Sequence, residues 1–237
     1  MSVGETGEPR LSGIGYWPPV GSLPFRAGNG HDCRRYRRAA ERVCVLARHP
    51  LRQCDIAATL GVSPQALSQI VGRVPLPDTP VSWAARRTCL AALWPCAVDD
   101  GAIQTYWYSV DPVVEQARSA INLGNDLAVR VLAGGEVAAD ALRPWRIPTR
   151  GLVYATEPID LSVVGLVQVT AEEATLTVRV PADPTVWATA SWWHRVTDGE
   201  HAGIPTVDPV VVLEDLAEGN VADDGARQRL IDWIVMR

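Results

Sequence analysis

The sequence predicts an α+β protein, with a mostly helical (winged) helix-turn-helix domain on its N-terminal side and a mixed α/β domain after it. Three observations predict this architecture. They are helical apolar spacing over 53–72, an Asp-Gly turn between β-prone segments near residue 100, and alternating apolar residues over 174–180. We expect an N-terminal arm, flexible or surface-bound, over 1–30, the helix-turn-helix domain over 31–110, and the α/β domain over 111–237.

The stretch 53–72, QCDIAATLGVSPQALSQIVG, has the spacing of two short helices joined by a tight turn. Gly61 tolerates the positive φ that ends the first helix. Ser63 followed by Pro64 is a start signal for the second, since serine accepts from a free amide and proline needs no donor there. The apolar positions at helical spacing are Ile56, Ala57, Leu60, Leu67 and Ile70.

The second helix of this unit has an outward face of short and amide side chains. Its members are Gln65, Ala66, Ser68, Gln69 and Arg73. The face carries no acidic residue, which suits a helix lying in the major groove of DNA. We expect Gln65 and Gln69 to pair with adenine edges, and Ser68 and Arg73 to contact bases or backbone. Ser63 is a candidate phosphate donor, with capping as its expected role. The alternative is an ordinary helical hairpin in a core.

A preceding helix is predicted over Asp32–Arg48, with a buried stripe at helical spacing. The stripe consists of Tyr36, Ala39, Ala40, Val43 and Ala47. Beside it lies a run of arginines that we expect to contact the DNA backbone: Arg34, Arg35, Arg37 and Arg38. The alternative for this run is a solvated helix surface.

Charge divides the chain into two parts of opposite sign. The net charge is −5, but residues 1–88 carry 12 arginines against 6 acidic residues, and 89–237 carry 10 against 21. The basic part holds the helix-turn-helix, where phosphate attraction would add affinity for DNA. All 22 basic residues are arginines. The absence of lysine argues against a Walker-type phosphate loop, a Schiff-base enzyme and a kinase.

Further elements follow from local signals. A helix over Ser82–Leu93 and a β-hairpin over 94–108, turning at Asp99-Asp100-Gly101, would complete the first domain, with the hairpin as a wing. In the second domain we expect helices over 111–123, 136–142, 208–217 and 222–235, and strands near 127–132, 151–155 and 174–180.

The ionisable and aromatic residues give weak signals for chemistry. His194, Asp198 and His201 form the best metal candidate, but their segment has the composition of a surface turn, so we expect no metal, no cofactor and no catalytic residue. The Asp99 and Asp100 pair is explained by the turn. An acidic helix with Asp208, Glu214, Asp215 and Glu218 is either a solvated face or a contact for a basic partner. Trp187, Trp192 and Trp193 are expected in the core, with only one of the adjacent pair facing inward.

The cellular setting follows from what the sequence lacks. No run of apolar residues is long enough for a membrane span, and the N-terminus has no secretory pattern. The five cysteines form no C-x-x-C pair, so neither a disulfide framework nor a zinc ribbon is expected. These features favour a cytoplasmic protein without a membrane partner.

The C-terminal half contains LRPWRIPTRGLVYAT, DLSVVGL, ATLTVRVPADPTVW and GIPTVDPVVVLEDLAEGN, followed by a final amphipathic helix. This order of segments, behind a helix-turn-helix, resembles the AbiE-type antitoxins, regulators from type IV toxin–antitoxin loci. The resemblance implies autorepression of an operon through the N-terminal domain. It also implies neutralisation of a nucleotidyltransferase-like toxin through the C-terminal domain, without a catalytic site.

Together these observations predict a non-enzymatic, sequence-specific transcriptional regulator that binds double-stranded operator DNA as a monomer or homodimer. Its expected biological role is that of an antitoxin that represses its own operon. A second hypothesis is a repressor whose C-terminal domain senses a small molecule. A pocket lined by tryptophans in that domain would favour this hypothesis. A third is an enzyme that its N-terminal domain targets to nucleic acid, and the missing lysines and sparse histidines argue against it.

Overall fold

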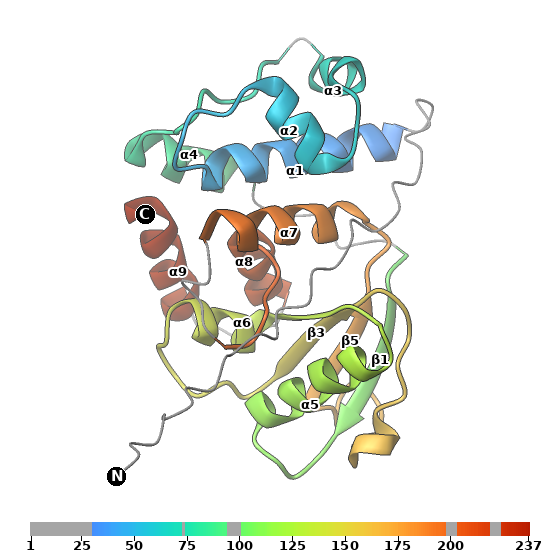
Figure 1. Cartoon of the computed structure of the whole chain (residues 1–237). Helices are drawn as coiled ribbons and strands as arrows, with labels where there is room; N and C mark the ends of the chain where they lie inside the picture. The colour runs from blue at the N-terminus through green and yellow to red at the C-terminus, as the bar shows by residue number, and fades with distance from the viewer. Residues whose placement is uncertain (1–29, 73, 94–100, 198–202, 219–223) are drawn as a thin grey trace, which may run out of the picture.

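The computed structural model describes residues 30–72, 74–93, 101–197, 203–218 and 224–237. In these residues the chain forms three layers (Figure 1). The N-terminal helices make the first layer, three C-terminal helices the second, and a five-stranded mixed sheet with its flanking helices the third. The predicted α+β class with a helical N-terminal region is therefore confirmed.

The first layer contains α1 (Gly30–Leu46), α2 (Gln53–Leu60), α3 (Pro64–Val71) and α4 (Trp83–Leu93). The predicted end of the first short helix and the predicted start of the second are both confirmed. Gly61 ends α2 at φ 67°, and the Ser63 hydroxyl accepts from the Ala66 amide at the start of α3. The five apolar positions predicted to be buried in α2 and α3 are all buried, and both helices pack against α1.

The sheet has the strand order β2-β3-β5-β1-β4. Its strands are β1 (Ile103–Tyr108), β2 (Val131–Gly134), β3 (Gly151–Ala155), β4 (Val167–Gln168) and β5 (Leu176–Val180). Only β3 and β5 run parallel, and the other neighbours are antiparallel. A short 3-10 helix, η1 (Leu161–Val164), precedes β4.

The expected wing is wrong for residues 103–108. These residues form β1, an interior strand that pairs with β5 along Ile103–Trp107 and with β4 at its end. The first half of that expected hairpin, 94–98, and its Asp99-Asp100 turn lie outside the described residues. Strand β1 therefore belongs to the sheet and is not a wing of the helix-turn-helix.

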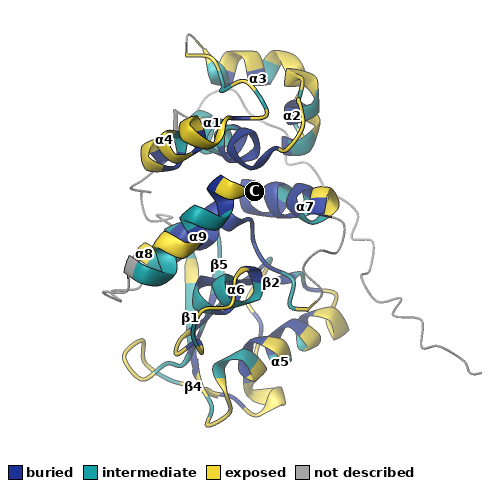
Figure 2. Cartoon of the chain, turned by 90° about the vertical axis from the view of Figure 1, so that its left-hand side faces the viewer, coloured by how far each residue is buried: buried dark blue, intermediate teal, exposed yellow. Residues whose placement is uncertain are grey.

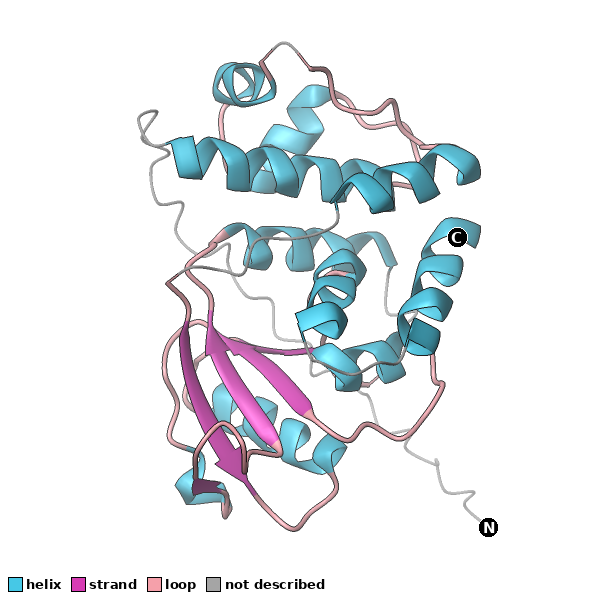
Figure 3. Ribbon diagram, turned by 180° about the vertical axis from the view of Figure 1, so that it is seen from behind, coloured by secondary structure: helices cyan, strands magenta, loops and turns pink. Residues whose placement is uncertain are grey.

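Helices cover the two faces of the sheet differently. One face packs against α5 (Val113–Asp126). The other face packs, over β2 and β3, against α6 (Gly135–Leu142), with α8 (Pro209–Glu218) behind it. Figure 3 views the sheet from this second side, where the helices lie beside β1 and β5 rather than over them.

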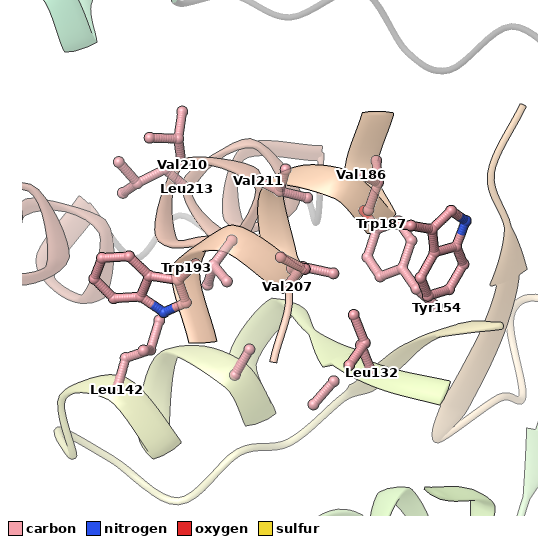
Figure 4. Close-up of a cluster of buried hydrophobic side chains, with 14 of the residues drawn as sticks. Leu132, Leu142, Tyr154, Val186, Trp187, Trp193, Val207, Val210, Val211 and Leu213 are labelled. Carbon is pink, nitrogen blue, oxygen red and sulfur yellow. The ribbon is translucent and has the colours of Figure 1, made fainter. Parts of the chain in front are cut away.

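The second layer joins the sheet to the N-terminal helices. It consists of α7 (Thr185–Thr197), α8 and α9 (Asp224–Met236), and α7 lies against α1. Helix α7 is apolar on more than one side because it is covered from both neighbouring layers. Trp192 and Trp193 are consequently both buried, so the expectation that only one would face inward is wrong, whereas the core placement of Trp187 is confirmed. Figure 4 shows Trp187 and Trp193 among the valines of α8 and the sheet residues Leu132 and Tyr154.

Candidate functional site

Helix α3 lies on the outside of the first layer, as the burial colours of Figure 2 show. Gln65, Ser68 and Gln69 are exposed, and Ala66 is half-buried. The Ser68 hydroxyl accepts a hydrogen bond of 2.8 Å from the Gln53 amide of α2. The polar surface therefore continues from α3 onto the N-terminal turn of α2. Ser63 caps α3, and Arg73 lies outside the described residues.

The arginines of α1 have a different environment from the one the sequence suggested. The Arg35 guanidinium donates to the Ala182 carbonyl at 3.2 Å, and the Arg38 guanidinium pairs with Glu214 at 2.9 Å. Arg37 pairs with Glu41 and donates to the carbonyl of Val71, the last residue of α3. Three of the four predicted phosphate-binding arginines thus make contacts within the chain, and Arg34 is the exposed one.

Two further arginines of the first layer are buried. Arg42 of α1 lies 3.3 Å from the Asp208 carboxylate, with both side chains almost fully buried. Arg86 of α4 donates to the Ile234 carbonyl of α9 and to the Ala47 carbonyl after α1. We refer to Arg35, Arg38, Arg42 and Arg86 as the interlayer arginines, because each connects a helix of the first layer to the C-terminal half. They join α1, on which α3 packs, and α4 to the C-terminal half.

The acidic side chains of the predicted acidic helix are engaged within the chain, and Glu218 among them is also exposed. Asp208 is buried, and its carboxylate caps α8 by accepting from the Val210 and Val211 amides. Asp215 is also buried, Glu214 pairs with Arg38, and Glu218 pairs with Arg179 at 2.7 Å. All four carboxylates therefore have partners within the chain.

Of the metal candidates, only His194 lies among the described residues, and its Nε2 is 2.8 Å from the Thr206 carbonyl oxygen. The part of the chain that the structure describes contains no group of three His, Cys, Asp or Glu side chains placed to hold a metal ion. Within that same part, no helix is both long enough and apolar enough to cross a membrane.

A cavity of about 320 Å³ lies over the uncovered part of the sheet. Its floor contains Gln104 and Tyr106 of β1 with Thr177 and Arg179 of β5, which are cross-strand partners on one face. The described residues around the floor come from β3, α6, α8, α9 and the loops 146–150 and 169–175. They include Glu136, Arg146, Arg150, Gly151, Leu152, Ala171, Asp215, Leu216, Glu218 and Ala226. No tryptophan is among the described lining residues.

A buried carboxylate stands at the inner end of this cavity. Asp215 accepts hydrogen bonds from the Gly135 amide at 3.0 Å and from the Tyr154 hydroxyl at 2.5 Å, and Arg179 lies at 3.5 Å. Burial raises the pKa of Asp215 to about 7, although Arg179 and these hydrogen bonds lower it. The sequence signalled Asp215 only as part of an acidic helix, because its partners lie at least 36 residues away.

The rim of the cavity is organised by Glu136. Its carboxylate accepts from Arg146 at 3.0 Å, from the Thr149 amide at 2.6 Å and from the Arg150 amide at 3.3 Å. These bonds fix the loop after α6 so that Arg146 and Arg150 both lie at the cavity. In the described part of the chain, the Arg150 guanidinium itself has no acidic partner.

Comparison with protein-family models, with curated proteins and with solved structures finds no match for this chain.

Proposed function

We propose that this chain is a cytoplasmic, sequence-specific DNA-binding transcriptional regulator that places α3 in the major groove. The observation that carries the proposal is the exposed face of Gln65, Ser68 and Gln69, which is free of acidic residues and continues to Gln53. Amide side chains pair with adenine edges in two hydrogen bonds, and serine hydroxyls reach either bases or phosphates.

The packing behind α3 supports the same proposal. A helix that reads DNA must be held rigidly, because base contacts depend on a fixed register against the backbone. Arg37 holds the C-terminal end of α3 through the Val71 carbonyl, and Leu67 and Ile70 anchor its inner face. The phosphate contacts then fall to Arg34 and to the first turns of α2 and α3, rather than to Arg35, Arg37 and Arg38.

The experiment is a fluorescence-anisotropy titration of the purified chain against the DNA upstream of its own gene, with a scrambled duplex of equal length, at two salt concentrations. The proposal predicts tighter binding to the upstream duplex and a clear loss of affinity at the higher salt concentration. Equal binding to both duplexes would contradict it.

A second role as an antitoxin is supported by an apolar surface at the β4 edge of the sheet. The exposed residues there are Tyr108, Val110, Val163, Val164 and Val167. Tyr108 and Val167 are cross-strand partners, so at least this pair is contiguous. Exposed apolar patches of this kind mark protein interaction sites. We propose that a nucleotidyltransferase-like toxin binds here, rather than on the acidic helix α8.

The antitoxin role is tested by co-expressing the chain with the product of the neighbouring gene and measuring co-purification. Val163→Asp should abolish the complex, and Val74→Asp, at an exposed valine of the first layer, should leave it intact. Complex formation unaffected by Val163→Asp would contradict this placement.

A further inference from the structure

We propose that the cavity over β1 and β5 binds a small organic anion by its carboxylate or phosphate group, with Arg150 and Arg179 as the anchoring cations. We further infer that its occupancy alters DNA binding through α8. The second part rests on the proposed function, and the first part does not.

The size and shape of the cavity fit a small molecule. Its volume of about 320 Å³ is at the lower end of the range of ligand pockets. The floor is the part of this sheet face that no helix covers, and its side chains are polar, as is usual for a sheet face in contact with water. Gln104, Tyr106, Thr177 and Arg179 make this floor hydrophilic.

Apart from its three carboxylates, the lining offers hydrogen-bond donors. Tyr106 donates to the Gln104 amide oxygen at 3.0 Å, which turns the amide so that its NH₂ group remains as a donor. The Thr177 hydroxyl adds a donor at the next cross-strand position. Such a set matches a ligand group rich in acceptors, and a guanidinium matches carboxylate or phosphate in a bidentate manner. Leu152 and Leu216 provide apolar contact for the body of the ligand.

The charges of the described lining balance, with Arg146, Arg150 and Arg179 against Glu136, Asp215 and Glu218, and Arg150 sets the place for an anion. Arg146 is neutralised by Glu136, whereas Arg150 has no acidic partner in the described part of the chain. Arg179 faces Glu218 and Asp215, but its contact with Asp215 is long at 3.5 Å. Arg179 is therefore paired in the free chain, and an anion would bind it by exchange with Glu218.

Helix α8 connects this cavity to the helix that supports α3. Asp215, Leu216 and Glu218, at the C-terminal end of α8, line the cavity. The same helix pairs with α1 through Glu214 and Arg38, and Asp208 at its start pairs with Arg42. An anion on Arg179 competes with Glu218 for the guanidinium. The competition changes the position of the C-terminal turn of α8, which carries Glu218. Helix α8 is joined by two ion pairs to α1, on which α2 and α3 pack.

The first experiment is isothermal titration calorimetry of the full chain with two anions, AMP and benzoate, at millimolar concentration. Adenosine is the uncharged control for AMP, and benzamide is the uncharged control for benzoate, because each pair shares the same ring system. The proposal predicts saturable binding of at least one anion with at least about tenfold preference over its counterpart, and which anion binds separates phosphate from carboxylate recognition. Binding of neither anion, or equal binding of the neutral molecules, would overturn it.

Variants locate the binding. Arg150→Glu should weaken binding of the anion about ten- to a hundredfold, because it removes a charge-assisted contact. The side chain is exposed, so we expect little effect of the substitution on folding. Arg195→Glu, at an exposed arginine of α7, is the matched control and should leave affinity unchanged. Thr177→Trp should fill the floor and abolish binding. Equal loss in both arginine variants would mean a general charge effect and would overturn the site.

The coupling is measured by repeating the operator titration with and without saturating anion. A change in operator affinity in the native chain that is absent in Arg150→Glu supports the coupling. No change, in a chain that binds both the anion and the operator, refutes the coupling alone. Absence of operator binding refutes the proposed function, and the calorimetric result still decides whether the cavity is a site.

Discussion

Replacing Arg42 by methionine tests whether the first layer is fixed to the rest of the chain by a buried ion pair. The Arg42 and Asp208 side chains are 2% and 0% exposed, and Arg42 also reaches the hydroxyls of Thr185 and Thr189 at 3.3 and 3.4 Å. Removing one partner leaves a buried charge without compensation, which costs about 3–5 kcal/mol. The native stability of a domain is about 5–15 kcal/mol, so the loss would be a large part of it.

The assay is urea denaturation followed by tryptophan fluorescence, with the free energy of unfolding extrapolated to zero urea. Arg42→Met should lower this free energy by about 3–5 kcal/mol, and the added substitution Asp208→Asn should recover part of it, since the amide oxygen still caps α8. Arg195→Met should remain within about 0.5 kcal/mol of the native chain. If the free energy of unfolding of Arg42→Met falls by less than about 1 kcal/mol, the buried ion pair does not fix the first layer to the rest of the chain.

Three other predictions concern single positions. Ser63→Ala should lower stability by about 1 kcal/mol, because the Ala66 amide loses its cap; an unchanged urea midpoint would exclude that role. Gly134→Ala should lower the thermal midpoint, since the new Cβ would lie 2.6 Å from the Tyr154 ring and 2.7 Å from the Asp215 carboxylate. Asp215 binds its proton more tightly in the folded chain, with a pKa of about 7 against 3.8. Its stabilisation is therefore complete below about pH 4 and is lost as the pH rises to about 7. Asp215→Asn should flatten this decline in urea titrations across that range, whereas an unchanged slope would show that Asp215 does not cause it.

Local signals in the sequence predicted much of the first layer. Gly61, Ser63 and Pro64 determine where α2 ends and α3 begins through contacts within four residues, so their effect can be predicted from the sequence alone. The buried positions of α2 and α3 followed from helical spacing for the same reason.

Long-range contacts explain what the sequence did not reveal. The run of arginines in α1 was interpreted as a phosphate-binding surface, because the partners Ala182 and Glu214 lie 147 and 176 residues later in the chain. Strand β1 was expected to pair with the segment 94–98 directly before it, but its partner is β5, some 70 residues away. Helix α7 was not predicted, since a helix covered from two sides has no polar face to give a periodic pattern.

The cavity was missed for a related reason. Its floor consists of alternate residues from β1 and β5, and its rim comes from the loop after α6. The only signal in the sequence was the alternation of polar and apolar residues in LTVRV, which predicts a strand with one solvated face. That pattern does not distinguish a cavity floor from an open surface.

We propose above that the outer face of α3 recognises the DNA sequence. Its most direct test compares the upstream-duplex affinity of Gln69→Ala with that of Gln168→Ala, an exposed glutamine of β4 at the opposite end of the molecule (Figure 2). We expect Gln69→Ala to lose about 1–3 kcal/mol of operator binding and to relax specificity at one base position, with Gln168→Ala unchanged. Native operator affinity in Gln69→Ala would contradict the account.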